Sequence, residues 1–313
     1  MVEVSVIVPA RDAAATLPAT LRALAAQSFD GGYEVIVVDD RSIDATAALA
    51  REAGARVLAT LDGGGPAEAR NLGARVARGR LLAFTDADCE PHRDWLAHGV
   101  AALRGGAELV QGPIRPLAGA PRGPFDRTLH VEGASPLFET ANLLVTREAF
   151  ERAGGFPAVP SGDGAAAKSF AEDTLFGWAV RRSGARAAFA ADAVVHHAVF
   201  PRGPRGYVAE RRRLERFPEL VRQVPELREH LTAGLFLSRR TAAFDLAVAG
   251  VLAAAALRRP WPLALAVPYC RVVGAPWPPR RSVARRFAAD VAADAVGLAA
   301  LVRGGLRSRT AIL

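Results

Sequence analysis

Two aspartates one residue apart, Asp86 and Asp88, follow closely after the apolar run "LLAF" at residues 81–84. Carboxylate oxygens at this spacing can bind Mg²⁺ or Mn²⁺ and leave coordination positions open for the phosphates of a substrate. An isolated D-x-D pattern is more often a pair of solvated turn carboxylates than a metal site. A metal site is therefore indicated only if other parts of the chain bring suitable groups to the same place.

The elements that must position these aspartates are predicted from the alternation of apolar and helical patterns between residues 4 and 112. Short apolar runs predict strands at residues 4–10, 33–40 and 55–60, a fourth from residue 81 and a fifth at 107–112. Amphipathic stretches between them predict helices. Continuous apolar strands joined by helical crossovers are typical of an α/β fold, with a mostly parallel central sheet flanked by helices on both faces.

Three of these strands carry polar groups at their carboxyl ends. In parallel α/β sheets, ligands bind beyond the carboxyl ends of the strands. We therefore expect one edge of the sheet to carry Pro9, Ala10 and Arg11 after the first strand, Asp39 and Asp40 after the second, and Asp86 and Asp88 after the fourth.

The chain continues with a Pro- and Gly-rich connection at 113–139, a strand at 140–146 and a short helix ended by glycines at 147–156. The glycine-rich stretch 161–169 is interpreted as a mobile loop. A helix from about 170 to 184 and a late strand pair at 185–199 complete this part of the chain.

Six ordered motifs resemble the family 2 glycosyltransferases: "VIVPARDAAATL", "EVIVVDDRSIDAT", "AEARNLGARVARGRLLAFTDADCEP", "TANLLVTREAFERAGGF", "AEDTLFGWAVRRSG" and "ADAVVHH". The resemblance covers residues 4 to about 200. It implies a GT-A (Rossmann-like) catalytic domain, assigned to residues 1–205. It also implies sugar transfer from a UDP-, GDP- or dTDP-sugar to a hydroxyl acceptor, which we expect to be lipid-linked or part of a cell-envelope glycan.

The resemblance also implies roles for individual residues on the donor side. The nucleotide base and ribose are expected to contact Pro9, Ala10, Arg11, Asp39 and Asp40, with Arg70 and Asn71 near the nucleotide and Asn142 near the sugar. The residue types alone leave alternatives open, because Asp39 and Asp40 could cap the following helix and Arg70 could lie on a helix surface. Asn142 could equally serve a turn.

Metal and catalytic roles are implied in the same way. Asp86 and Asp88 match the motif that binds Mn²⁺ or Mg²⁺, and His197, or less favourably His196, is expected to complete the metal or diphosphate site. Asp173, with Glu172 beside it, matches the general base of an inverting displacement. A structural histidine and an acidic pair at a helix N-terminus are the alternatives.

Two positions depart from the pattern of many relatives, which read E-D-x-D-L-x-x-R. Here Leu175 stands for the second aspartate and Ala179 for the arginine. Because these positions can support the acceptor side, the identity of the acceptor is not carried over. The two cysteines, Cys89 and Cys270, match no metal or disulfide spacing and are interpreted as buried thiols.

Residues 206–313 form a basic, apolar tail. Residues 200–313 hold 20 Arg against 8 Asp and Glu, a net charge of +12, whereas residues 1–199 have a net charge of −4. Apolar runs at 242–257 and 287–302, with arginine clusters and tryptophans beside them, predict helices associated with an anionic membrane surface. A soluble helical subdomain is the alternative. Nucleic-acid binding is not expected, because residues 211–230 lack interleaved aromatics.

The N-terminus shows no signal-peptide pattern, so the catalytic domain is expected on the cytoplasmic side of a membrane. Two other enzyme classes are disfavoured. A sugar-phosphate nucleotidylyltransferase would need a glycine-rich loop after the first strand, where this chain reads "PARDAAAT", and a dinucleotide oxidoreductase would need G-x-G-x-x-G there. A non-catalytic basic scaffold that binds membrane or nucleic acid through its tail stays open as an alternative.

Overall fold

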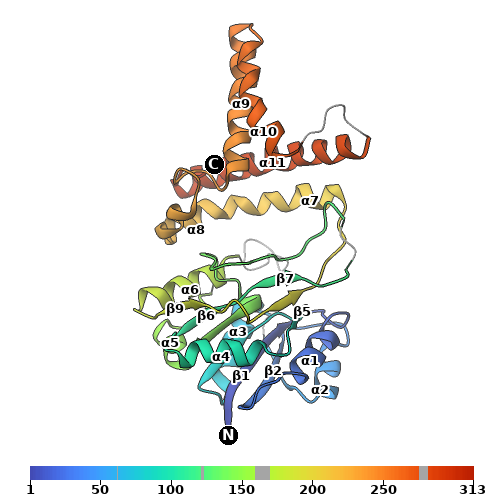
Figure 1. Ribbon diagram of the computed structural model, residues 1–313, viewed down its shortest axis with the longest axis vertical. Helices are drawn as coiled ribbons and strands as arrows, with labels where there is room; N and C mark the ends of the chain where they lie inside the picture. Colours follow the sequence, from blue (N-terminus) through green and yellow to red (C-terminus); the bar gives the residue numbers. More distant parts are fainter. Residues whose placement is uncertain (62, 121–122, 159–169, 275–280) are drawn as a thin grey trace. The chain divides into compact units, whose positions relative to one another are not determined.

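The computed structural model describes residues 1–61, 63–120, 123–158, 170–274 and 281–313. The loop expected at 161–169 therefore lies outside the described residues. The chain divides into two compact units (Figure 1). Unit 1 consists of Met1–Pro121 with Thr128–Phe200, and unit 2 of Arg122–Arg127 with Pro201–Leu313.

Unit 1 is built on a seven-stranded sheet with the order β3-β2-β1-β4-β8-β6-β9. The strands are β1 (Val2–Ala10), β2 (Gly32–Asp39), β3 (Arg56–Ala59), β4 (Leu81–Phe84), β6 (Leu109–Gln111), β8 (Leu143–Thr146) and β9 (Ala187–Phe189). Neighbouring strands pair in parallel except where β8 pairs with β4 and β6. The prediction of a mostly parallel α/β sheet is confirmed.

Six helices of unit 1 are α1 (Leu17–Ala25), α2 (Thr46–Glu52), α3 (Gly65–Val76), α4 (Trp95–Arg104), α5 (Arg147–Arg152) and α6 (Glu172–Arg182). Successive residues of a strand point to opposite faces of the sheet. Val6 and Val8 accordingly join one apolar cluster with residues of α1 and α4, whereas Ile7 joins another with residues of α3, α5 and α6. The helices therefore cover both faces, as the continuous apolar strands predict.

A second, three-stranded sheet has the order β5-β10-β7 and consists of β5 (Cys89–Pro91), β10 (Val195–His197) and β7 (Ile114–Pro116). β5 follows the D-x-D motif directly. The antiparallel pairing of β10 with β5 places His197 opposite Cys89. This small sheet thus brings a segment more than a hundred residues further along the chain next to the two aspartates.

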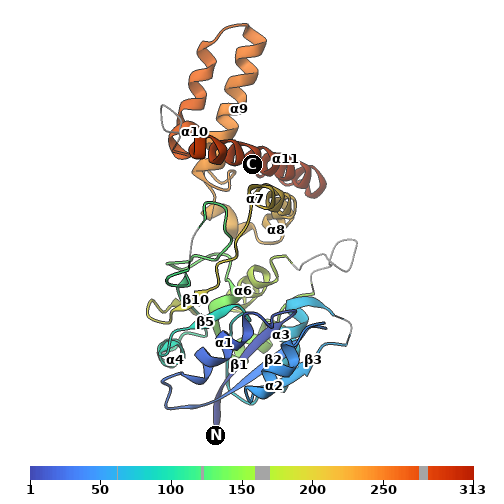
Figure 2. The same ribbon diagram turned by 90° about the vertical axis from the view of Figure 1, so that its right-hand side faces the viewer.

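Unit 2 is helical. Its elements are α7 (Pro204–Glu210), η2 (Arg211–Arg216), α8 (Phe217–Gln223), η3 (Pro225–His230), α9 (Arg239–Leu257), η4 (Trp261–Ala266), α10 (Val267–Val272) and α11 (Arg281–Ser308). α9 and the segment η4–α10 form a helical hairpin that stands on α11 (Figure 2). Ser238 and Thr241 form a capping box that fixes the start of α9.

A buried polar network ties the hairpin to α11. Arg240 donates 2.8 Å hydrogen bonds to both Asp290 and Asp294 of α11. The hydroxyl of Tyr269 in α10 donates to Asp294 at 2.6 Å, and that of Tyr207 in α7 donates to Asp290 at 2.9 Å. The two aspartates of α11 are four residues apart on one helical face, and their hydrogen bonds connect α11 to α7, α9 and α10.

Beyond this network the hairpin is apolar and exposed. Val251, Leu252, Leu257, Trp261 and Leu263 are among its exposed large side chains. Within the described residues, α9 is the one helix that is long and apolar enough to cross a membrane, and only 22% of its apolar window is buried. By length and composition, α9 is therefore a candidate for contact with a membrane.

Candidate functional site

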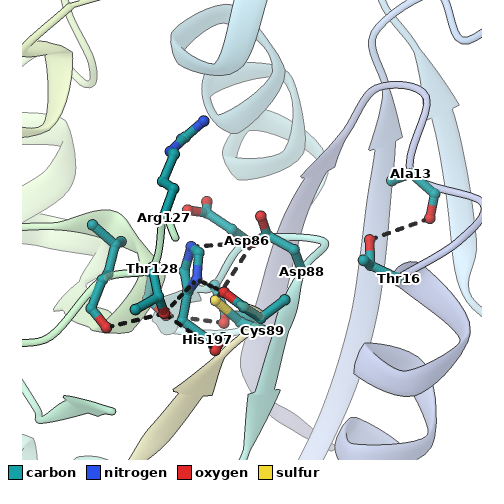
Figure 3. Close-up of polar contacts among 12 residues, drawn as sticks. Ala13, Thr16, Asp86, Asp88, Cys89, Arg127, Thr128 and His197 are labelled. Atoms are coloured by element: carbon teal, nitrogen blue, oxygen red, sulfur yellow. Dashed lines mark hydrogen bonds and ion pairs between the residues drawn. The ribbon is translucent and has the colours of Figure 1, made fainter. Parts of the chain in front are cut away.

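The carboxyl ends of β1, β2 and β4 carry polar side chains, as expected from the parallel sheet. Pro9 and Ala10 at the end of β1 pair with Val38 and Asp39 at the end of β2. The loop after β4 carries Asp86 and Asp88, and Figure 3 shows both beside Cys89 and His197.

Asp88, Cys89 and His197 each offer one ligand atom, and the three atoms lie within 4.8 Å of one another. His197 Nε2 lies 3.7 Å from Asp88 Oδ1. The Nδ1 atom of His197 lies 2.6 Å from the carbonyl oxygen of Ala198, so Nδ1 carries the hydrogen and donates it. Nε2 is therefore the ring nitrogen that lies nearer to Asp88, and a metal-binding histidine likewise uses one ring nitrogen for the metal and the other for a hydrogen bond.

Strand geometry distinguishes the two neighbouring histidines. His197 is buried and faces Asp88, whereas His196 lies on the other face of β10 because side chains alternate along a strand. The resemblance favours His197 over His196 as the residue that completes the metal or diphosphate site. The structure offers a physical reason, because side chains alternate along β10 and His197 is the histidine that lies near Asp88. Thr128, which no sequence pattern indicated, lies with its hydroxyl oxygen 3.4 Å from His197 Nδ1.

Cys89 is a weaker candidate ligand than the other two residues. Burial raises the pKa of its thiol well above the ordinary value, and the charges of Asp86 and Asp88 raise it further. A protonated thiol is a poor ligand for Mg²⁺ or Mn²⁺, which prefer oxygen donors. The carboxylate of Asp88 and the imidazole of His197 suit Mn²⁺ better than Mg²⁺, which prefers oxygen donors.

Arg70 connects Asp86 to the acidic pair of α6. Its Nη2 donates to Asp86 Oδ1 at 2.8 Å and its Nη1 to Glu172 Oε1 at 3.3 Å. The guanidinium is buried and lies over the ring of Phe156, 5.6 Å from its centroid. Burial alone would lower the pKa of Arg70, but the charges of Asp86 and Glu172 outweigh burial and raise it. The surface-helix alternative for Arg70 is therefore wrong.

Asp173 lies in the first turn of α6, after Ala171, whose φ of 68° is in the left-handed region. Burial, followed by the negative charge of Glu172, raises the pKa of Asp173 to about 7. Glu139 contributes to the same increase. A carboxylate with a pKa near neutrality can exchange a proton with a substrate hydroxyl at physiological pH.

Glu139 is a site residue that the sequence analysis missed. Its Oε1 accepts a hydrogen bond from Ser135 at 3.0 Å, and its buried Oε2 has no hydrogen-bond partner among the described residues. α6 fixes the preceding segment, because Trp178 Nε1 donates to the carbonyl of Pro136 at 2.9 Å. The available signal was its position directly before the "TAN" motif.

The two aspartates at the end of β2, Asp39 and Asp40, are buried and differ in their partners. Asp40 accepts a 2.7 Å hydrogen bond from Thr60, and Arg11 Nη1 lies 3.7 Å from its other oxygen. Asp39 Oδ1 has no partner among the described residues. Neither aspartate caps α2, whose N-terminus is instead contacted by Asp44 through the backbone N–H of Thr46. The capping alternative is thus wrong, and Asp39 retains a free acceptor.

Asn71 and Asn142 are occupied within the protein. Asn71 bonds both the N–H and the carbonyl of Phe156, at 2.9 and 2.8 Å. Buried Asn142 accepts from Trp95 Nε1 at 2.8 Å and donates to the carbonyls of Pro113 and Ala193. These bonds favour a structural role for both amides, and their expected contacts with nucleotide and sugar stay predictions.

Comparison with known proteins identifies the class to which this sheet and site belong. Residues 5–158 match the family model described as "Glycosyl transferase family 2". Glycosyltransferase AglE of Haloferax volcanii is 32% identical over 169 residues, which are 49% of this chain and 56% of the relative. The 4,4'-diaponeurosporenoate glycosyltransferase of Staphylococcus haemolyticus is 43% identical over 93 residues, 28% of this chain and 24% of the relative.

Solved structures share the fold. The mannosyltransferase PcManGT from Pyrobaculum calidifontis, in complex with GDP-Man and Mn²⁺, superposes with a TM-score of 0.58 at 24% identity over 96% of this chain and 86% of that one. TarS 1–349 of S. aureus, in complex with UDP-GlcNAc, gives 0.51 at 17% identity over 98% and 92%. The fold is that of a GT-A glycosyltransferase. Residues 5–158 of the chain thus match a glycosyl transferase family 2 domain, and the chain spans about half the length of the first curated relatives it matches.

Proposed function

We propose that this protein transfers a sugar from a nucleotide-sugar donor to a hydroxyl acceptor, with a divalent cation and with inversion at the anomeric carbon. The observation that carries the proposal is the buried ion-pair chain from Asp86 through Arg70 to Glu172. These ion pairs connect Asp86, one of the carboxylates proposed to bind a cation, with Glu172, the residue next to Asp173. Both ends of a displacement reaction, the leaving group and the base, are thereby held in one rigid arrangement.

The donor is a UDP-, GDP- or dTDP-sugar. The free Oδ1 of buried Asp39 can accept a hydrogen bond from a base N–H or a ribose hydroxyl, beside Asp40 and the end of β1. Arg11 is half exposed beside Asp40 and can contact the same nucleotide. That one structural neighbour contains GDP-Man and another UDP-GlcNAc supports a nucleotide sugar as the class of donor.

Asp86, Asp88 and His197 would hold Mn²⁺ or Mg²⁺. When bound there, the cation would neutralise the negative charge that develops on the departing nucleoside diphosphate. Buried Arg70 orients Asp86, because its guanidinium donates a hydrogen bond to one carboxylate oxygen. The second oxygen of Asp86 is then the one available to a cation.

Asp173 serves as the general base. The acceptor oxygen attacks the anomeric carbon while its proton passes to the Asp173 carboxylate, and the bond from that carbon to the diphosphate oxygen breaks with its electron pair. One displacement inverts the configuration. Because burial and Glu172 raise the pKa of Asp173 to about 7, the carboxylate is a stronger base than an exposed aspartate.

The domain boundary and cellular placement complete the proposal. Residues 1–205 are the catalytic domain, and residues 206–313 attach it to the cytoplasmic face of a membrane through the exposed apolar hairpin of α9, η4 and α10. A lipid-linked or cell-envelope acceptor fits such a location. Nucleic acid is not a partner in this proposal.

A binding screen tests the proposal. UDP-, GDP- and dTDP-sugars are titrated with and without Mn²⁺ against the wild type, Asp88→Asn and the exposed control Asp192→Asn. We expect Mn²⁺-dependent binding of at least one donor that Asp88→Asn removes and Asp192→Asn retains. Absence of any such donor would refute glycosyl transfer. Full function in Asp86→Ala, Asp88→Ala and Asp173→Ala variants would instead favour a non-catalytic scaffold.

A further inference from the structure

Unit 2 contains a groove of about 780 Å³ between α7, η2, α11 and the segment 123–127. We call it the α7–α11 groove. Much of its lining is apolar and comes from Phe125, Val208, Ala288, Ala289 and Val296. Its charged lining consists of four arginines, Arg205, Arg212, Arg285 and Arg286.

The positive charge of this groove is not balanced by the protein. No Asp or Glu is among its described lining residues. Arg205, Arg212 and Arg285 are exposed and form no ion pair with described residues, and Arg286 has only a 3.9 Å contact with Asp290. Other arginines of the unit, such as Arg240, are paired with carboxylates at much shorter distances. A cluster of unpaired guanidinium groups beside an apolar lining favours an anionic, amphiphilic ligand.

The chemistry favours a phosphate over a carboxylate as the anionic group. A phosphate monoester carries about −1.5 to −2 charges at pH 7 and three acceptor oxygens, whereas a carboxylate carries one charge and two oxygens. Guanidinium groups form paired, charge-assisted hydrogen bonds with phosphate. Nucleic acid is a poorer match, because the aromatic ring in the described lining, Phe125, packs against Tyr207 with centroids 5.4 Å apart.

The same unit has an apolar surface that suits a bilayer. Figures 1 and 2 show the hairpin of α9 and α10 standing on α11, and α11 also lines the groove. Exposed Leu252, Trp261 and Leu263 on the hairpin would bring unit 2 to a lipid surface. We propose that the α7–α11 groove binds a membrane lipid whose head group is a phosphate. This inference does not depend on sugar transfer by unit 1.

The full-length protein is titrated with monomeric dioctanoyl phosphatidic acid, below its micelle concentration, by isothermal calorimetry. We expect saturable binding that Arg205→Gln/Arg212→Gln/Arg285→Gln weakens at least about tenfold, because charge-assisted hydrogen bonds are lost. The matched control, Arg213→Gln/Arg239→Gln/Arg309→Gln, removes three exposed arginines outside the groove and should stay within about twofold of wild type. Equal weakening in both variants would mean that general positive charge attracts the lipid, and would overturn the proposal.

A second variant tests the apolar lining while keeping every arginine. Ala288→Trp fills the groove from an exposed helical position, and Ala299→Trp makes the same change at an exposed position of α11 outside the lining. Only Ala288→Trp should abolish lipid binding. Inorganic phosphate should bind at least about tenfold more weakly than the lipid, because it buries no apolar surface. Binding of inorganic phosphate as tightly as the lipid, or displacement of the lipid by single-stranded RNA, would each overturn the proposal.

Discussion

The guanidinium of Arg70 donates a 2.8 Å hydrogen bond to Asp86, sixteen residues further along the chain. The other arm of the same guanidinium reaches Glu172 at 3.3 Å, 102 residues away. Arg70 and Glu172 are buried, so neither charge can be compensated by solvent if the other is removed. This arginine is therefore the structural link between the candidate cation ligands and the candidate base.

Arg70→Met should destabilise unit 1 by about 3 kcal/mol, because Asp86 and Glu172 would lose their buried counter-ion. Arg75→Met, at an exposed position of the same helix, is the matched control and should change stability by less than about 0.5 kcal/mol. Urea unfolding followed by circular dichroism measures both. Equal stabilities of the two variants would show that the ion-pair chain does not hold the site together.

Asp173→Asn should reduce kcat by about 10² to 10⁴ while leaving the Kd of the donor within about twofold, because a base acts on the acceptor hydroxyl rather than on donor binding. In the wild type, kcat should rise with pH and level off above about 7, since Asp173 accepts a proton only when ionised. A pH–rate series checks the profile. A flat profile between pH 5 and 8 contradicts the assignment.

The same pKa predicts the pH dependence of stability. The folded-state pKa of about 7 lies above the ordinary value of 3.8, so the folded protein holds this proton more tightly than the unfolded chain does. Ionisation of Asp173 therefore costs stability progressively as pH rises from about 4 to about 7. Asp173→Asn should remove this loss and unfold at a higher temperature than wild type at pH 8, with a smaller difference at pH 4. Thermal unfolding at the two pH values measures the effect.

His197→Ala should weaken Mn²⁺ binding at least about tenfold, because it removes the imidazole that faces Asp88. His196→Ala, the adjacent residue on the opposite face of β10, provides the control and should leave Mn²⁺ affinity unchanged. Electron paramagnetic resonance of free Mn²⁺ in the presence of UDP or GDP gives both affinities. A larger effect at His196 would mean that the cation binds elsewhere.

Leu252→Glu/Leu263→Glu should weaken binding of the protein to vesicles by at least about tenfold, because each introduced charge would have to enter the apolar layer of the membrane with the hairpin. Ile43→Glu/Leu61→Glu places the same charges at exposed apolar positions of unit 1 and should have no effect. Sedimentation with vesicles in 1 M NaCl separates insertion from adhesion of arginines to anionic lipid. Complete release of the wild type at this salt concentration would contradict hairpin insertion.

The sequence by itself determined the sheet and the position of the acidic groups along it. Apolar runs such as 4–10 and 81–84 specify buried parallel strands through local periodicity. Asp39, Asp86 and Asp88 follow such strands, so their place at one edge was predictable from strand order alone. The acidic pair Glu172–Asp173 was likewise predictable at a helix start, because it precedes an amphipathic stretch.

Tertiary structure decided which side chains meet. The choice between His197 and His196 depends on the register of β10 against β5, which shifts every side chain to the other face if it slips by one residue. Three further features depend on segments far apart in sequence. They are the ion pairs of Arg70, the hydrogen bonds that occupy the side-chain amide of Asn142, and the contribution of Glu139 to the raised pKa of Asp173. Local patterns specify an element and its buried face, but contacts between distant elements depend on how the faces pack. The site therefore became specific only in the folded chain.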